Sequence, residues 1–127
     1  MILELVLLAI GGALGAVARF HLTRKIAARY PTPRFPLATL LINAAGSAAL
    51  GLIMGLRFSQ VFWDLHHDPV FLMLGVGFCG AFTTFSTFNI ETMALLRDGG
   101  PWRALGYIAA TLIACVALFA LCFWAST

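Results

Sequence analysis

Three long stretches of the chain carry no charged residue and consist mainly of hydrophobic side chains. They run from Phe35 to Leu56, from Val70 to Ile90 and from Ala104 to Thr127. A fourth stretch, from Ile2 to Ala18, is interrupted only by Glu4 at its edge. A helix needs about 20 mainly apolar residues to cross a bilayer, and each stretch comes close to or exceeds that length. The pattern therefore predicts four transmembrane helices, near residues 2–20, 37–57, 70–96 and 102–125.

The composition supports a membrane protein. Of 127 residues, 61% are hydrophobic and 10% are charged, whereas about a quarter of the residues in a soluble domain are charged. We predict an all-α integral membrane protein with a single four-helix domain over residues 1–127. The first segment is not typical of a signal peptide, because it lacks a basic start and Arg19 stands where a small cleavage residue is needed.

Small residues mark the faces on which we expect the helices to pack. Gly11 and Gly15 lie four residues apart in the first segment, and the second segment is rich in glycine and alanine from Ala44 to Gly55. Such spacing lets helix backbones approach closely in lipid. Four helices of this length cannot readily enclose a water-filled path. If the protein forms such a path, we therefore expect it to assemble at least as a dimer.

The most unusual stretch is the run from Gly77 to Phe88. It places three threonines, a serine and two glycines inside a segment long enough to span a bilayer. Polar irregularity at that depth normally lines a space enclosed by protein or filled with water. The phenylalanines of this run are spaced for one helix face, and they are Phe78, Phe82, Phe85 and Phe88. We expect a break near the middle of this helix and a pathway for something small and polar.

The remaining polar positions narrow the function. Asn43 lies inside the second segment, where an amide is either a functional group or an interhelical hydrogen bond. Glu4 and Glu91 fall towards the ends of their segments, so no span has a carboxylate at its centre. This favours passive conduction of a substrate that is not a cation. No nucleophile lies beside a base, which argues against an enzyme.

Hydroxyl donors and the electropositive edges of phenylalanine rings suit a small anion. Carbonyls freed at a helix break would instead suit a cation. The sequence thus offers both kinds of site within one or two helical turns. The adjacent histidines, His66 and His67, lie beside Asp64 and Asp68 without the spacing of a zinc site, so we interpret them as interfacial polar residues.

Positive charge gathers on one side of the predicted membrane topology. The termini and connection 57–69 share one face, which carries only Arg57. The opposite face carries seven basic residues: Arg19, Arg24, Lys25, Arg29, Arg34, Arg97 and Arg103. Such a bias predicts a single orientation in the membrane. No basic stripe with interleaved aromatic residues lies outside the spans, so nucleic acid is not an expected partner.

The chain resembles the CrcB/Fluc family of fluoride channels across all four helices. The matching motifs are Gly11–Ala16 with Arg19, Thr39-Leu40 with Asn43 and Gly46, and the run from Gly77 to Phe88 followed by Glu91-Thr92. Ala38 and Ala81 replace glycines that are usual in the family, which are small-for-small changes. The run 77–88 is the most specific of these motifs.

The resemblance implies a passive, highly selective channel that exports F⁻ from the cytoplasm across the cell inner or plasma membrane and gives fluoride resistance. It implies an antiparallel, dual-topology dimer with two pores and a structural Na⁺ at its centre. The backbone carbonyls of Gly80 and Thr83 would hold the Na⁺. The implied pore residues are Asn43, Phe85, Ser86, Thr87, Phe88, Tyr107 and Thr111. Cys115 stands where the family has a further hydroxyl.

Two questions stay open at this point. An antiparallel homodimer needs both orientations, which the charge bias opposes, so the partner is either a second copy of the chain or an oppositely oriented paralogue. Two other function classes also fit the size and span count. They are a proton-coupled exporter of the small multidrug resistance type, which would need a carboxylate deep in the first helix, and a non-transporting membrane assembly subunit.

Overall fold

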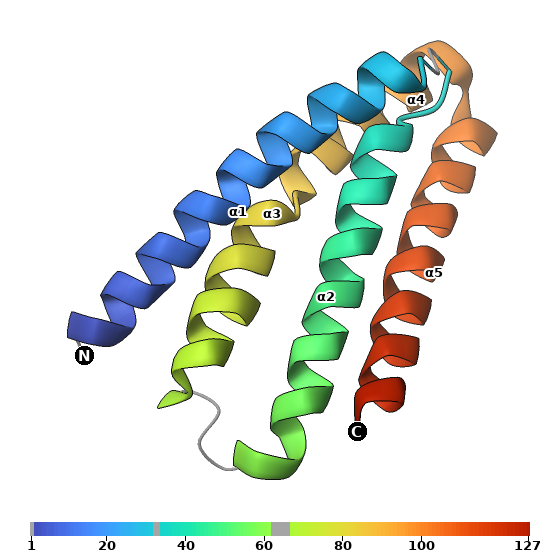
Figure 1. Ribbon diagram of the computed structural model, residues 1–127. Helices are drawn as coiled ribbons and strands as arrows, with labels where there is room; N and C mark the ends of the chain where they lie inside the picture. Colours follow the sequence, from blue (N-terminus) through green and yellow to red (C-terminus); the bar gives the residue numbers. More distant parts are fainter. Residues whose placement is uncertain (1, 32–33, 62–66) are drawn as a thin grey trace.

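The computed structural model describes residues 2–31, 34–61 and 67–127, and in this part helices are the only regular secondary structure, with no strand. The elements are α1 (Ile2–Arg29), α2 (Leu37–Val61), the π-helix η2 (Phe71–Cys79), α3 (Gly80–Phe82), α4 (Phe85–Gly99) and α5 (Pro101–Ser126) (Figure 1). Four segments are long and apolar enough to cross a membrane: Ile2–Arg29, Leu37–Arg57, Phe71–Gly99 and Pro101–Ser126. The structure thus confirms an all-helical chain with four such helices.

The first helix is longer than the hydrophobic pattern predicts. We expected it to end near residue 20, but α1 continues to Arg29. Residues 21–29 contain no glycine or proline, and the first proline is Pro31. Hydropathy marks where a helix leaves the bilayer, whereas the helix itself ends where its backbone hydrogen bonding ends. For the same reason α2 continues past residue 57 to Val61.

Neighbouring helices pack closely at glycine positions, where no side chain separates the two backbones. A Cβ atom on Gly11 would collide with the carbonyl of Met73, and one on Gly15 with the carbonyl of Phe78. A Cβ atom on Gly51 of α2 would likewise collide with the carbonyl of Phe119 on α5. These contacts confirm that the small residues are packing positions, and they hold α1 against η2 and α2 against α5.

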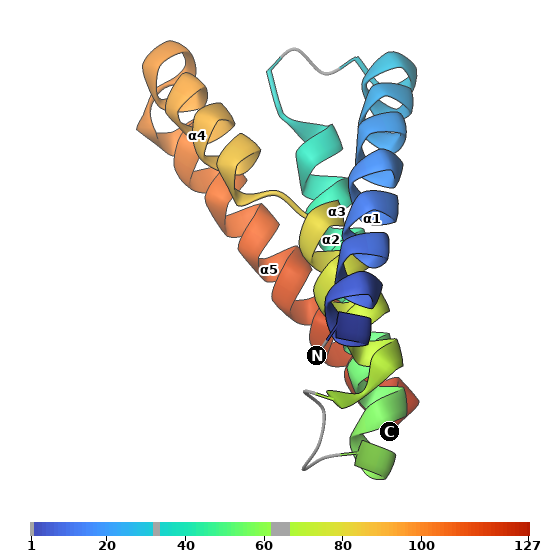
Figure 2. The ribbon, with the colours of Figure 1, turned by 90° about the vertical axis from the view of Figure 1, so that its left-hand side faces the viewer.

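The third span has two parts that lean on different neighbours. Its first part, η2, packs on α1 and α2, whereas α4 packs on α5. Figure 2 shows α4 and α5 leaning together away from α1. Thr83 and Thr84 join the two parts and have extended backbone, with ψ angles of 162° and 121°. Both chain termini lie towards one end of the bundle, and the C-terminal ends of α1 and α4 lie towards the other (Figure 1).

An ion pair between a partly exposed arginine and a buried aspartate joins the end of the second span to the start of η2. Asp68 is buried and accepts a hydrogen bond from Nε of Arg57 at 2.9 Å and from the N–H of Phe71 at 2.7 Å. Burial by itself would raise the pKa of Asp68, but these hydrogen bonds and the Arg57 charge outweigh it and lower the pKa below its ordinary value. Nearby, Nδ1 of His67 lies 2.7 Å from Oε1 of Glu4. Asp64 and His66 lie outside the described residues.

Candidate functional site

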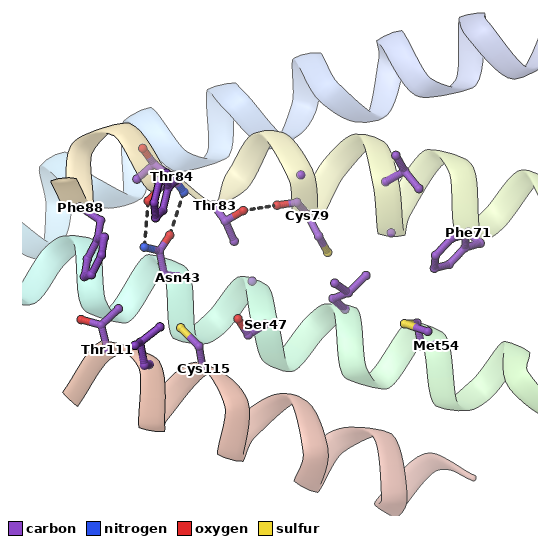
Figure 3. Close-up of a pocket in the computed structure, with 17 residues that line it drawn as sticks. Asn43, Ser47, Met54, Phe71, Cys79, Thr83, Thr84, Phe88, Thr111 and Cys115 are labelled. Atoms are coloured by element: carbon purple, nitrogen blue, oxygen red, sulfur yellow. Dashed lines mark hydrogen bonds between the residues drawn. The ribbon is translucent and has the colours of Figure 1, made fainter. Parts of the chain in front are cut away.

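A cavity of about 540 Å³ lies between α2, the third span and α5 (Figure 3). Six of the residues proposed from the sequence line it: Asn43, Gly80, Thr83, Phe85, Phe88 and Thr111. Its other polar or sulfur-containing wall residues are Ser47, Met54, Cys79, Thr84 and Cys115. No charged side chain lines this cavity in the described part of the chain. The cavity therefore brings together residues from three separate stretches of the sequence.

Asn43 holds the extended link of the third span in place. Its Nδ2 donates to the carbonyl of Thr84 at 3.0 Å, and the N–H of Thr84 donates to its Oδ1 at 2.8 Å (Figure 3). In an unbroken helix that N–H would donate to the carbonyl of Gly80. The amide of Asn43 thus satisfies two backbone groups at membrane depth and leaves the Gly80 carbonyl without its helical partner.

Arg19 bonds to the same link from the other side. Its Nη1 donates to the carbonyl of Thr83 at 3.1 Å, across 64 residues of sequence. Arg19 is half-buried inside the bundle, so it does not belong to the basic connection in which the sequence pattern counts it. The basic residues then number six on one face and one on the other.

The two phenylalanines expected at the pore differ in exposure. Their ring centroids lie 6.0 Å apart, but Phe85 is 74% exposed while Phe88 is 8% exposed. Phe88 packs against the ring of Tyr107 with centroids 5.3 Å apart. Phe88 is therefore held by contacts within the chain, whereas the ring of Phe85 is exposed on the surface of the single chain.

A hydrogen-bonded group lies behind Phe88. The hydroxyl of Tyr107 donates to Oε2 of Glu91 at 2.8 Å, and the hydroxyl of Thr39 donates to Oε1 of Glu91 at 2.9 Å. Tyr107 is fully buried and does not line the large cavity. The sequence alone predicts no role for Thr39 or Glu91, although both lie inside the family motifs. The sequence pattern predicts Glu91 close to the end of its helix, and in the structure Glu91 accepts hydrogen bonds from two other helices.

Thr111 is different, because its Oγ1 is buried and has no hydrogen-bond partner among the described residues. The residue is 4% exposed and lines the large cavity one turn of α5 after Tyr107. Buried hydroxyls nearly always have a partner. This hydroxyl therefore has no close hydrogen-bond partner among the described residues, although the hydroxyl of Tyr107 lies near enough to interact with it.

Ser86 and Thr87 lie elsewhere. They line a second cavity of about 320 Å³ together with Arg19 and Arg24. The hydroxyl of Thr84 donates to Oγ1 of Thr87 at 3.0 Å and lies 3.4 Å from Oγ of Ser86. Thr84 lines both cavities, so the link held by Asn43 stands between them.

Comparison with known proteins identifies the group to which this arrangement belongs. Residues 6–123 match the family described as CrcB-like protein, Camphor Resistance (CrcB). The chain belongs to the CrcB family. It is therefore a multi-pass membrane protein, in agreement with its four apolar helices.

Three relatives show how far the likeness extends. The Carboxydothermus hydrogenoformans protein is 41% identical over 121 residues, which cover 95% of this chain and 91% of that protein. The Halalkalibacterium halodurans protein is 36% identical over 125 residues, 98% of each chain. The Pyrococcus furiosus protein is 43% identical over 117 residues, 91% of this chain and 89% of that protein. The first two are named Fluoride-specific ion channel FluC 1 and the third Fluoride-specific ion channel FluC.

Proposed function

We propose that this CrcB-family chain forms a passive, selective fluoride channel that exports F⁻ from the cytoplasm across the cell membrane. The names of its relatives support the substrate, and the cavity supports a channel rather than an enzyme. The observation that carries the proposal is the uncharged cavity wall, on which Phe85, Phe88 and the unpartnered hydroxyl of Thr111 stand together.

The chemistry of the wall suits an anion that holds its water tightly. A pore must replace that water with donors and still release the ion. The hydroxyl of Thr111 is a donor with no described protein acceptor, and the edges of the Phe85 and Phe88 rings carry partial positive charge. Because no described lysine or arginine lines the cavity, no basic side chain would trap the anion there.

We propose that two copies, in opposite orientations, complete the pathway and form two pores. The support is that Phe85 is 74% exposed although it stands on the wall of the cavity. A second copy laid over this face would cover the ring and close the cavity. The charge bias of six to one still favours one orientation, so an oppositely oriented paralogue is the alternative partner. Sidedness reporters on both termini, in cells lacking paralogues, would label both sides of the membrane for a homodimer and one side otherwise.

We also propose a structural Na⁺ held by the backbone carbonyls of Gly80 and Thr83 from both copies. The donor set fits a hard cation, which prefers oxygen ligands. The Gly80 carbonyl has lost its helical partner because the Thr84 N–H bonds to Asn43. The Thr83 carbonyl accepts one bond from Arg19 and has a second lone pair. A bound Na⁺ would join the two helix links and supply a fixed positive charge beside the pathway.

The test is fluoride efflux from liposomes that contain the purified protein, followed with a fluoride electrode. We expect efflux without any proton gradient and with little chloride flux. Absent efflux, or equal chloride flux, would overturn the proposal. Efflux that depends on a proton gradient would favour a coupled exporter. Such an exporter would need a carboxylate deep in the first helix, whereas Glu4 lies near the start of α1 and is bonded to His67.

A further inference from the structure

The helix α1 is longer than a bilayer requires. Its 28 residues span about 42 Å at 1.5 Å per residue, whereas the hydrocarbon core of a bilayer is about 30 Å thick. The helix begins with an apolar run at Ile2, and Arg19, the first basic residue, is bonded within the bundle. The surplus of about eight residues therefore falls at the C-terminal end, over residues 22–29, at the level of the lipid headgroups.

Two basic side chains of this segment are not neutralised by any described group. Lys25 and Arg29 lie one turn apart and are exposed, and neither forms an ion pair with another described residue. They also differ from Arg24, which lines the cavity of Ser86 and Thr87, because neither of them lines that cavity or the large one. Their charge is therefore available to something outside the chain and away from both cavities.

The side of α1 that carries these charges is turned away from the bundle. Thr23 and Ile26 are the less exposed residues of the segment and mark the side that faces the other helices. Leu22, Lys25 and Arg29 are spaced by three and four residues, which places them together on another face. We call these three residues the outer face of α1. In Figure 2 the last turns of α1 lie apart from α4 and α5.

Apolar and aromatic side chains accompany the charges. Leu22 is 40% exposed, and Tyr30, just after the helix, is 54% exposed with its ring centroid 5.6 Å from the guanidinium carbon of Arg29. Tyrosine is enriched where a membrane meets water. At that level the stems of lysine and arginine lie along apolar surface while their charged ends reach the headgroups. The outer face thus has both the apolar and the basic groups that a phospholipid contacts.

We propose that the outer face of α1 is a binding surface for the headgroups of anionic phospholipids. The lipid phosphate meets Lys25 and Arg29, and the start of the acyl chains meets Leu22. Each basic residue at a membrane surface strengthens the attraction to anionic lipid by about fivefold. Each copy of the chain carries its own outer face, so the surface serves either orientation in the membrane and does not depend on the fluoride activity.

The test is a lipid titration of the full chain, purified in a neutral detergent. Phosphatidylglycerol, which is anionic, and phosphatidylcholine with the same acyl chains are added separately, and bound lipid is measured by native mass spectrometry. Lys25→Gln with Arg29→Gln removes both charges, whereas Lys25→Arg with Arg29→Lys keeps them. Arg97→Gln with Arg103→Gln removes the same charge from the turn between α4 and α5, at the same end of the bundle. Size exclusion reports folding and assembly of each form.

We expect the unchanged chain to prefer phosphatidylglycerol, and the preference to weaken at high salt. It should fall about 25-fold when Lys25 and Arg29 become glutamine, fivefold for each charge, and persist when the charges are kept.

Equal affinity for both lipids, or an equal fall in the Arg97 and Arg103 control, would overturn the surface. Loss of assembly with the lipid preference retained would do so too, because it would assign the face to a protein partner. Fluoride efflux from liposomes should stay normal without the two charges, since neither residue lines the two cavities. If the unchanged chain releases no fluoride, the proposed function fails, while the titration still decides the lipid surface.

Discussion

The two parts of the third span share one stretch of sequence but do different work. The first part, η2, packs so closely on α1 that Gly11 and Gly15 have no room for a Cβ atom. The second part, α4, leans on α5 and presents Phe85 and Phe88 to the large cavity. Both parts line the cavity, but glycines fix the first part against α1, whereas the second part rests on α5 and adds two phenylalanine rings to the wall.

The largest effect is expected on the packed side, from Gly15→Ala. The added Cβ would collide with the backbone of Phe78, where no side chain can rotate away. We expect a loss of stability of about 1–3 kcal/mol or more and a poor yield of folded protein on size exclusion. Gly106→Ala is the matched control, because nothing lies within 4 Å of its added Cβ. If both variants behaved alike, close packing would not explain the glycine.

The second-largest effect is expected when the side-chain amide of Asn43, which bonds to the link between the two parts, is removed. Asn43→Ala strips the N–H and the carbonyl of Thr84 of their partners, at a cost of about 1–3 kcal/mol for each buried group. We expect flux to fall about a hundredfold, because the start of α4 loses its anchor. The thermal unfolding midpoint should fall as well, whereas Ser47→Ala, one turn further along the same cavity, should leave that midpoint unchanged. Normal flux in Asn43→Ala would contradict this role.

On the wall side, Phe85→Ile and Phe88→Ile should reduce conduction and leave assembly intact. Isoleucine keeps the apolar bulk but has no ring edge, so the electropositive contact with the anion is lost. We expect fluoride efflux to fall by about tenfold or more in each variant. Phe88→Ile also loses the ring contact with Tyr107, so its unfolding midpoint should be the lower of the two. Unchanged efflux in both would remove the ring-edge mechanism.

Thr111→Val should separate transport from folding. Valine has nearly the same shape, and no described protein hydrogen bond is lost, so the unfolding midpoint should stay the same or rise slightly. Efflux should fall about tenfold because a donor of the pathway is gone. Thr111→Ser keeps the donor and should keep most of the flux. A fall in stability without a fall in flux would indicate a structural role.

The smallest effect on transport is expected from Asp68→Asn, at the start of the packed part. The lowered pKa of Asp68 means that its ionised form is favoured in the folded chain. Its contribution to stability is therefore present at neutral pH and is lost as the pH falls below about 4 and through the lowered pKa. The unfolding midpoint of the natural chain should fall over this range, and Asp68→Asn should show less of that fall. Equal pH profiles would contradict the ion pair with Arg57.

Much of this could be predicted from the sequence, because hydropathy and glycine spacing are local properties. Three spans follow from charge-free stretches and the first from a stretch with a single charge near its start, and the packing of Gly11 and Gly15 follows from their spacing. Contacts between distant segments could not be predicted in this way. Nothing local shows that Arg19 reaches Thr83, that Glu91 bonds to Thr39 and Tyr107, or that Ser86 and Thr87 line a separate cavity.

The sequence by itself determined that the chain crosses a membrane, where its polar residues interrupt a span, and which family motifs it carries. These follow from the cost of burying charge and unpaired polar groups in lipid. Only the tertiary structure decided which of those polar groups satisfy one another. Asn43 hydrogen-bonds to the backbone N–H and carbonyl of Thr84, whereas the hydroxyl of Thr111 has no close hydrogen-bond partner among the described residues. That distinction depends on the placement of α2, α4 and α5 in space.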